Sequence, residues 1–238
     1  MKIFDRGFRL TWLGHSAFEL VTKTGKVVLF DPWLTGNPRT PEALRAPRRG
    51  DVIALTHAHG DHVGDVVGIV GRTGCEVVCS YECSIWLAAQ GVSTCLPMGK
   101  GGTQQAAGLT FTMTHAAHSS SFDAPGQPYG GGEAGYVVTL EDGFRLYHAG
   151  DTGPMADFAV IAELYAPEVA LLPIGDLFTM GPREAAWAAA KLDAKWVVPM
   201  HYGTFPALTG TPEALRAELA ARGCGAVVVA PQPGEPVE

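Results

Sequence analysis

Residues 55–65 read LTHAHGDHVGD and place three histidines and two aspartates within eleven positions, although the chain of 238 residues has only eight histidines. The histidines follow the apolar residues Val52–Leu55, which predict a buried strand. Burying polar side chains costs free energy unless they find partners, and a metal ion compensates for their desolvation. The stretch therefore predicts a metal site whose other ligands lie elsewhere in the chain.

The composition is that of an ordinary folded protein. Hydrophobic residues make up 47% of the chain and charged residues 17%, with a formal net charge of −7. The length allows a sizeable core in one large domain or two small ones. This acidic balance gives no reason to expect nucleic acid as a partner. The only dense basic run, Arg39–Arg49, is interpreted as a solvated loop with a short helix.

No targeting or membrane segment is expected. The first twelve residues lack a long apolar stretch, which argues against a signal peptide and for a cytoplasmic protein. A membrane helix needs about 18 uninterrupted apolar residues, and the most apolar region, Val160–Ile174, is interrupted by charged residues and prolines. We therefore expect no membrane span.

The five cysteines are odd in number, and a cytoplasmic location argues against disulfides. Cys75, Cys79 and Cys83 recur every four residues, a spacing that suggests a thiolate zinc site. However, residues 76–79 have the pattern of a strand and Cys83 that of a helix start, so these cysteines are predicted to be small buried hydrophobic residues.

Short apolar runs between turn signals predict strands, and longer periodic segments predict helices. The predicted strands are Phe8–Trp12, Phe18–Val21, Val27–Phe30, Val52–Leu55, Glu76–Cys79, Leu109–Thr114, Tyr136–Leu140, Phe144–Tyr147, Val169–Pro173, Trp196–Pro199 and Ala226–Val229. The predicted helices are His62–Val70, Ser84–Gln90, Met155–Leu164, Pro182–Leu192 and one that begins at Thr211-Pro212-Glu213.

This order of elements predicts two sheets with helices packed outside them. No short repeat and no clear linker is visible, so residues 1–238 are expected to form one domain with two similar halves. The glycine-rich loop Pro125–Gly132 is either flexible or held against another part of the molecule. In the helix 181–192, which is rich in alanine, Trp187 is predicted to be a buried anchor.

The metal site begins with His57 and His59, whose side chains point to the same side of an extended segment and can reach one ion. Asp61 and His62 follow the flexible Gly60 and can turn to a second ion. Three further candidates, His118, Asp151 and His201, each stand after a predicted strand, where a rigid scaffold presents functional side chains.

HAHGDH matches the H-x-H-x-D-H signature of the metallo-β-lactamase superfamily, which the chain resembles over nearly its whole length. WLGHSAFEL, FDPWLTGNP, HAAHSSSF, YHAGDTG, LLPIGDLFTMGP and VVPMHYGTFP resemble, in order, the motifs of one branch, the UPF0173 metal-dependent hydrolases. That branch is similar to the ascorbate-phosphate lactonases and to N-acyl-phosphatidylethanolamine phospholipase D. The resemblance implies an α/β fold, a four-layer αβ/βα sandwich of two mixed sheets with helices outside and a two-metal site at one edge.

The resemblance also implies a ligand set. It assigns one ion to His57, His59 and His118, the other to Asp61, His62 and His201, and the bridging position to Asp151. Nitrogen and oxygen ligands suit Zn²⁺, the expected metal, and also Mn²⁺ or Fe²⁺. Two such ions about 3.5–4 Å apart can hold a hydroxide between them at neutral pH.

Several polar residues have alternative interpretations. His115 lies three residues before His118, but only His118 is followed by the serine run. His115 is therefore interpreted as a strand-end residue or as a residue that supports a ligand from behind. His148 is interpreted as a structural histidine. Asp65 is either a helix-surface carboxylate or the hydrogen-bond partner of a ligating imidazole.

His15 in WLGHSAFEL is either a turn residue or, with Asp61, a catalytic residue, because the phospholipase-like branch resembles this chain in a similar glycine-histidine turn. As a catalytic residue it would protonate the leaving group or stabilise a developing oxyanion.

The predicted function is a binuclear metal-dependent hydrolase that uses a metal-bridging hydroxide on an ester, lactone or phosphodiester bond of a small-molecule substrate. By resemblance, Asp151 stands where the best-known zinc β-lactamases have cysteine, and His59 where flavodiiron oxygen reductases have glutamate. Both differences argue against those activities. A non-catalytic metal-binding scaffold and a ribonuclease-like nuclease are the alternatives, and the acidic balance disfavours the nuclease.

Overall fold

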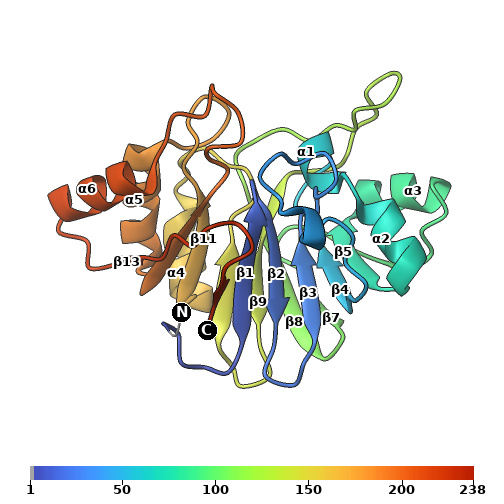
Figure 1. Cartoon of the computed structure of the whole chain (residues 1–238), viewed down its shortest axis with the longest axis horizontal. Helices are drawn as coiled ribbons and strands as arrows, with labels where there is room; N and C mark the ends of the chain where they lie inside the picture. The colour runs from blue at the N-terminus through green and yellow to red at the C-terminus, as the bar shows by residue number, and fades with distance from the viewer. Residues whose placement is uncertain (1–2) are drawn as a thin grey trace.

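The computed structural model describes residues 3–238 (Figure 1). Its strands are β1 (Arg9–Gly14), β2 (Ala17–Val21), β3 (Val27–Phe30), β4 (Val52–Ala54), β5 (Glu76–Ser80), β6 (Cys95–Met98), β7 (Thr103–Ala106), β8 (Leu109–His115), β9 (Ala134–Thr139), β10 (Arg145–His148), β11 (Val169–Pro173), β12 (Trp196–Met200), β13 (Val227–Val228) and β14 (Pro236–Val237). Its helices are α1 (Gly60–Val63), α2 (Val66–Thr73), α3 (Tyr81–Ala89), α4 (Asp157–Tyr165), α5 (Pro182–Leu192) and α6 (Pro212–Ala221), with a 3-10 turn at Glu42–Leu44.

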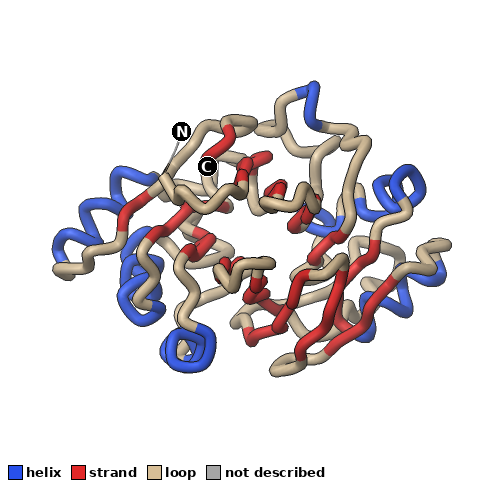
Figure 2. The backbone as a smooth tube through the Cα atoms, turned by 90° about the horizontal axis from the view of Figure 1, so that it is seen from below, coloured by secondary structure: helices blue, strands red, loops and turns tan. Residues whose placement is uncertain are grey.

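Within the described residues the strands form two seven-stranded sheets. The first has the order β14-β1-β2-β3-β4-β5-β6 and the second β13-β12-β11-β10-β9-β8-β7. The two sheets lie face to face with the helices on the outside (Figure 2). Helices α2 and α3 lie on one flank and α4, α5 and α6 on the other (Figure 1). This is the predicted α/β sandwich of two mixed sheets with outer helices.

Strand β3 shows how the apolar pattern builds the layers. All four of its residues are buried, because side chains alternate between the two faces of a strand. Val28 and Phe30 join the main core between the sheets, whereas Val27 and Leu29 join a second core beneath α2 and α3. A strand covered on both faces reads as a continuous apolar run, which is why its bounds match the prediction.

The topology brings the polar motifs to one edge of the sandwich. Strands β1, β3 and β4 run in the same direction, so their carboxyl ends share one edge of the first sheet. Strands β8, β10, β11 and β12 likewise run together in the second sheet. Loops at the carboxyl ends of such strands are where α/β folds place their sites.

Some predicted elements differ from the structure. The helix predicted at His62–Val70 is broken into α1 and α2 at Gly64 and Asp65. Gly64 packs against Trp33, since a Cβ atom there would lie 2.7 Å from the Trp33 Cδ1 atom, and the Asp65 N–H donates to the Pro32 carbonyl. Contact with the loop after β3 thus interrupts the helix. Strands β6, β7 and β14 are missing from the prediction. The residues of β6 are mostly half-exposed, those of β7 are mostly polar, and β14 has only two residues.

Trp187 is a correction to the predicted buried anchor. Helix α5 begins and ends as predicted, and its alanines 185, 186, 188 and 189 are fully buried. Trp187 itself is only partly buried, edge-on to Phe158 at 6.3 Å between ring centroids, with the Lys191 Nζ atom 5.8 Å from its centroid. The buried face of α5 consists of small alanines, which let the helix lie close to the sheet. The larger indole of Trp187 therefore lies at the side of the helix.

The other features follow the predictions. Cys75, Cys79 and Cys83 are buried and all five cysteines are unpaired. The run Arg39–Arg49 is a surface loop with the 3-10 turn. Within residues 3–238, no helix is long and apolar enough to cross a membrane.

Candidate metal centre

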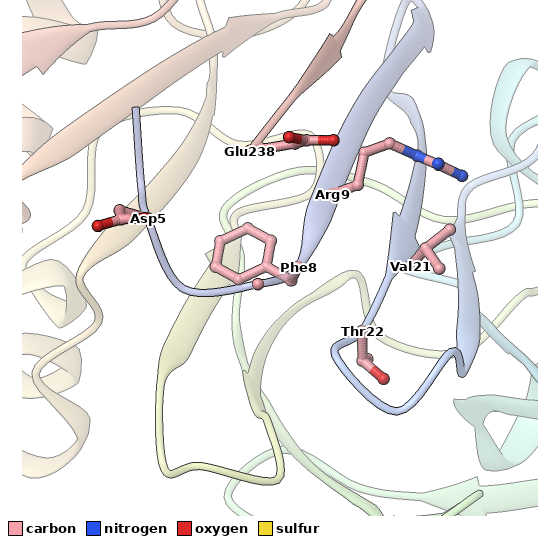
Figure 3. Close-up of a pocket in the computed structure, with 7 residues that line it drawn as sticks. Asp5, Phe8, Arg9, Val21, Thr22 and Glu238 are labelled. Atoms are coloured by element: carbon pink, nitrogen blue, oxygen red, sulfur yellow. The ribbon is translucent and has the colours of Figure 1, made fainter. Parts of the chain in front are cut away.

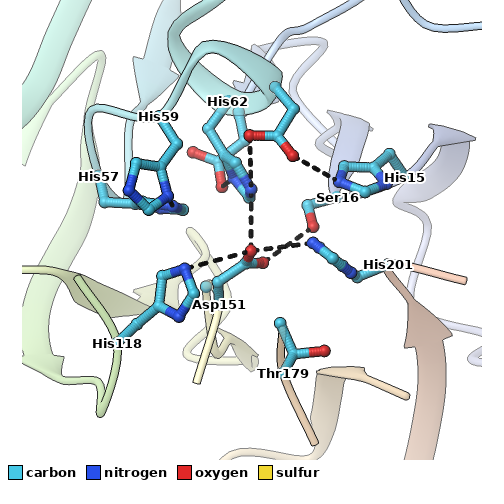
Figure 4. A network of polar contacts seen from close by, with 12 residues as sticks. His15, Ser16, His57, His59, His62, His118, Asp151, Thr179 and His201 are labelled. Carbon is cyan, nitrogen blue, oxygen red and sulfur yellow. Dashed lines mark hydrogen bonds and ion pairs between the residues drawn. The ribbon is translucent and has the colours of Figure 1, made fainter. Parts of the chain in front are cut away.

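Seven predicted ligands converge at the edge between the two sheets (Figure 4). The three-histidine group, His57, His59 and His118, offers nitrogen atoms that all lie within 4.8 Å of one another. His57 and His59 come from the segment after β4, and His118 comes from the segment after β8 in the other sheet. His57 is buried, whereas His59 and His118 are partly exposed.

A second cluster, the mixed group, consists of His15, Asp61, His62 and His201, whose ligand atoms also lie within 4.8 Å of one another. It contains the three residues predicted for the second ion together with His15. The side chains of His15 and His62 are fully buried and that of His201 is 3% exposed, whereas the Asp61 side chain is 32% exposed. Asp61 is therefore the solvent-facing member of this group.

The Asp151 carboxylate joins the two groups. Its Oδ2 atom lies 3.8 Å from His118 Nε2, 3.2 Å from His62 Nε2 and 2.9 Å from His201 Nε2. Its Oδ1 atom accepts a hydrogen bond of 3.4 Å from the Ser16 hydroxyl. An oxygen that faces nitrogens from both groups has the placement that a bridging carboxylate needs.

The residues present fit divalent ions. The His62 Nε2 atom is buried without a hydrogen-bond partner among residues 3–238, although it faces the carboxylates, and a buried nitrogen normally has such a partner. Burial lowers the pKa of His57 and of His118, and nearby imidazoles lower it further, so both rings are in the neutral form that could bind an ion. Burial raises the pKa of Asp151, but the charges of His201 and His62 outweigh it and hold that pKa well below its usual range.

His62 behaves differently. Burial lowers its pKa, but the attraction of Asp151 and Asp31 raises it well above the ordinary histidine value. Without an ion, a proton on His62 thus compensates the two buried carboxylates. A divalent cation bound at the same Nε2 atom would supply that positive charge instead.

Asp31 is a residue that the sequence interpretation missed. It follows β3, is fully buried, and accepts hydrogen bonds from His62 Nδ1 at 2.7 Å and from the Thr56 hydroxyl at 2.6 Å. Because the Thr56 hydroxyl gives its proton to Asp31, it accepts from His57 Nδ1 at 3.0 Å. Both imidazoles therefore carry their proton on Nδ1 and present Nε2 to the site. The signal available in the sequence was the stretch FDPW, in which this aspartate directly follows an apolar run that predicts a buried strand.

His15 stands behind Asp61. Its Nε2 atom donates to Asp61 Oδ2 at 3.1 Å, and its Nδ1 atom faces the Thr204 hydroxyl at 2.9 Å. Burial lowers the pKa of His15 to about 4, so the ring is neutral at pH 7. The hydrogen bond from His15 lowers the pKa of Asp61 in spite of its burial. Both ring nitrogens of His15 are thus occupied, and its ring fixes the direction of the Asp61 carboxylate.

Three site residues have left-handed backbone conformations, which are uncommon for residues other than glycine. The φ angles are 54° at His15, 40° at Asp31 and 55° at His201. The His201 N–H donates to the His15 carbonyl, which links two of these turns across the sheets. Such conformations cost about 1–3 kcal/mol each and cluster at functional sites.

The ambiguous residues lie as follows. His115 is outside the site, with its Nδ1 atom 3.0 Å from Lys100 Nζ. His148 is buried and structural, since it contacts the Ser16 carbonyl through Nε2 and accepts from the Gly150 N–H. Asp65 contacts no ligating imidazole. Its carboxylate accepts from the N–H groups of Leu34 and Thr35, which corrects one of its two interpretations.

The glycine-rich loop is held against another part of the molecule at Gly130, whereas residues 125–127 are exposed. It belongs to a hairpin, residues 119–131, that starts directly after His118 and carries a bridge between Ser121 and Tyr129. The Gly130 carbonyl accepts from the Ser80 hydroxyl, and Asp123 accepts from the Gly60 N–H. The hairpin therefore borders the three-histidine group.

A hollow elsewhere has a different character. About 310 Å³ of space is lined by Asp5, Gly7, Phe8, Arg9, Val21, Thr22 and Glu238 (Figure 3). It lies at the start of β1 and the end of β2, whereas His15 follows the other end of β1. Among residues 3–238, no histidine lines it, unlike the centre described above.

Comparison with known proteins gives a consistent family. A family model for the beta-lactamase superfamily domain matches residues 26–202. The chain is 46% identical to a UPF0173 metal-dependent hydrolase of Koribacter versatilis (strain Ellin345), over 88% of this chain and 91% of that protein. It is 47% identical to one of Methanopyrus kandleri, over 97% of this chain and 99% of that protein.

Solved structures have the same fold. A metallo hydrolase of the hyperthermophilic archaeon Ignicoccus hospitalis, Igni18, is 37% identical with a TM-score of 0.85, and the match covers 97% of each chain. An isothiocyanate hydrolase from Delia radicum gut bacteria is 21% identical with a TM-score of 0.72, covering 97% of this chain and 98% of that chain. The latter similarity concerns the fold alone.

Proposed function

The chain belongs to the beta-lactamase superfamily and, within it, to the UPF0173 family, and from this premise we propose that it is a metal-dependent hydrolase with a two-ion centre. The observation that carries the proposal is the position of Asp151 Oδ2, which faces nitrogens of both ligand groups. A single-ion site would not need a shared carboxylate. Hydrolysis is supported by the names of the relatives, which are metal-dependent hydrolases.

In this proposal His57, His59 and His118 would hold one ion and Asp61, His62 and His201 the other, and Asp151 would serve both. Zn²⁺ suits these ligands, and Mn²⁺ or Fe²⁺ are the alternatives. When bound, two divalent ions supply an activated water and polarise the atom under attack.

The proposed substrate is a small molecule with an ester, lactone or phosphodiester bond. In its hydrolysis the oxygen of water bonds to the carbonyl carbon or the phosphorus, the bond to the leaving oxygen breaks, and that oxygen takes up the proton of the water. Asp61 is the solvent-facing carboxylate of the centre and the group placed to touch substrate.

The role that fits His15 is a positioning one. Its low pKa and its two occupied nitrogens disfavour proton donation to the leaving group and favour orientation of Asp61. Thr204 supports this role because its hydroxyl holds the opposite side of the ring. His15 would act on substrate through Asp61.

The alternative of a non-catalytic metal-binding scaffold predicts the same two ions as the hydrolase. The two proposals differ only in whether the protein turns over a substrate. The nuclease alternative is disfavoured by the net charge of −7, which repels a polyanion. A cytoplasmic location also stays a prediction.

The test is a screen of chromogenic phosphodiesters, lactones and thioesters with protein loaded with Zn²⁺ or Mn²⁺. We expect turnover of at least one bond class and its loss in Asp151→Asn, with circular dichroism showing that the variant remains folded. Glu163→Gln removes one exposed carboxylate from α4 and serves as the matched control. No turnover of any class by protein that carries both ions would favour the scaffold.

A further inference from the structure

Two aromatic side chains border the Asp61 side of the centre. Trp33 follows β3 and Phe205 follows β12, and their ring centroids lie 6.1 Å apart. Each ring lies edge-on to the His15 ring. The ring-centroid distance and interplanar angle are 5.4 Å and 80° for Trp33, and 5.9 Å and 70° for Phe205. Because His15 donates to Asp61, the aromatic pair lies beside the part of the centre that is open to solvent.

The pair is held in place by its surroundings. A Cβ atom on Gly36 would lie 2.6 Å from Trp33 Nε1, and one on Gly64 would lie 2.7 Å from Trp33 Cδ1, so both glycines make room for the indole. Phe205 directly follows Thr204, whose hydroxyl contacts His15. Both rings thus contact the His15 ring, which also donates to Asp61.

These rings remain accessible. Phe205 is 41% exposed and Trp33 is partly exposed. Leu177 and Phe178, both more than half exposed, lie in a loop held to the Asp151 segment by the hydrogen bond from Met180 N–H to the Thr152 carbonyl. A single exposed apolar side chain is ordinary, but several around one polar centre mark a binding surface.

We infer that Trp33 and Phe205 form a subsite for an apolar group of the substrate, of about the size of a phenyl ring. The substrate would then be amphipathic, with its hydrolysable bond at the ions and its apolar group against the aromatic pair. The inference rests on the proposed function for the identity of the polar part. Only the apolar part is assigned by the rings.

Binding of two phosphonates to protein loaded with Zn²⁺ tests the subsite. Methylphosphonate and benzylphosphonate carry the same anion, and only the second carries a ring. We expect benzylphosphonate to bind about tenfold more tightly or better, because ring burial adds apolar contact. Isothermal titration calorimetry measures both dissociation constants, and no turnover is needed.

Variants separate the subsite from other exposed rings. Phe205→Ala and Trp33→Leu should each lower the preference for benzylphosphonate and leave methylphosphonate binding unchanged. Tyr129→Leu is the matched control, because Tyr129 lies in the hairpin beside the three-histidine group. This variant should keep the preference for benzylphosphonate. Equal affinity for the two probes in the unmodified protein, or a preference that persists in Phe205→Ala and Trp33→Leu, would overturn the inference. Since turnover plays no part, such a result would leave the proposed hydrolysis standing.

Discussion

The three-histidine group and the mixed group differ in how tightly the fold holds them. His59 and His118 are partly exposed. Among residues 3–238, the ring of His59 has the Ser119 hydroxyl, at 3.5 Å, and His57 as its hydrogen-bonding neighbours. In the mixed group, His62 is fixed by Asp31 and Asp61 by His15, which Thr204 holds in turn. Partners behind a ligand orient it before an ion arrives. The mixed group is therefore the preorganised half of the centre, and the three-histidine group the adaptable half.

Removal of the shared carboxylate should have the largest effect, because it affects both halves at once. In Asp151→Asn we expect loss of both ions and a fall in kcat/KM of about 10³-fold or more, since metal catalysis supplies several kcal/mol. Metal analysis of protein purified without chelator measures the stoichiometry, with Glu163→Gln as the control. One ion retained at full occupancy would show that the two groups do not share Asp151.

Replacement of His15 should show whether this residue positions Asp61 or binds an ion itself. In His15→Ala we expect both ions and the fold to remain, while kcat falls by about 10²-fold and KM changes little. His15→Gln keeps an N–H donor for Asp61 and should recover part of the rate, which a merely structural role would not explain. Loss of one ion would instead show that His15 contributes to metal binding, directly or through Asp61.

Asp31 tests whether the partners behind the ligands matter. Asp31→Asn should weaken metal affinity by about 10–100-fold, because the proton positions on His62 and His57 are no longer fixed. Asp65→Asn is the matched control, since that carboxylate contacts only the loop at Leu34 and Thr35. Competition with a chromogenic chelator measures both affinities. Equal metal affinity of the two variants would show that Asp31 does not orient the imidazoles of His62 and His57 for the ions.

Partial metal removal compares the two halves directly. Under mild chelation the ion at the three-histidine group should leave first, because its ligands are more exposed and less fixed. Co²⁺-substituted protein would show this order in its absorption spectrum, and His118→Ala should resemble the partly stripped protein. Loss from the mixed group first would reverse the comparison.

Trp187 belongs to neither group, and its replacement should change stability alone. Because it is only partly buried, we expect Trp187→Ala to cost about 1–2 kcal/mol of unfolding free energy. Phe158, its neighbour, is fully buried, so we expect Phe158→Ala to lower the unfolding free energy by about 3–5 kcal/mol. Denaturant unfolding of both variants measures the difference, and equal costs would show that the indole carries more packing than its exposure indicates.

The sequence alone determined what depends on neighbours along the chain. His57, His59, Asp61 and His62 are close in space because they are close in sequence. The apolar runs of β3 and β11 and the alanine-rich α5 were predicted with their observed bounds. The resemblance in the order of the motifs predicted the sandwich fold and the remaining ligands. That the chain is one domain with two similar halves stays a prediction.

Only the tertiary structure decided what depends on residues far apart in the sequence. Asp31 reaches His62 and Thr56 because β3 and β4 are parallel neighbours, and no local pattern marks that hydrogen bond. The break at Gly64, the exposure of Trp187 and the place of His15 behind Asp61 arise in the same way. Local patterns fix how a segment folds, whereas packing between segments decides which polar atoms meet and which side chains stay at the surface.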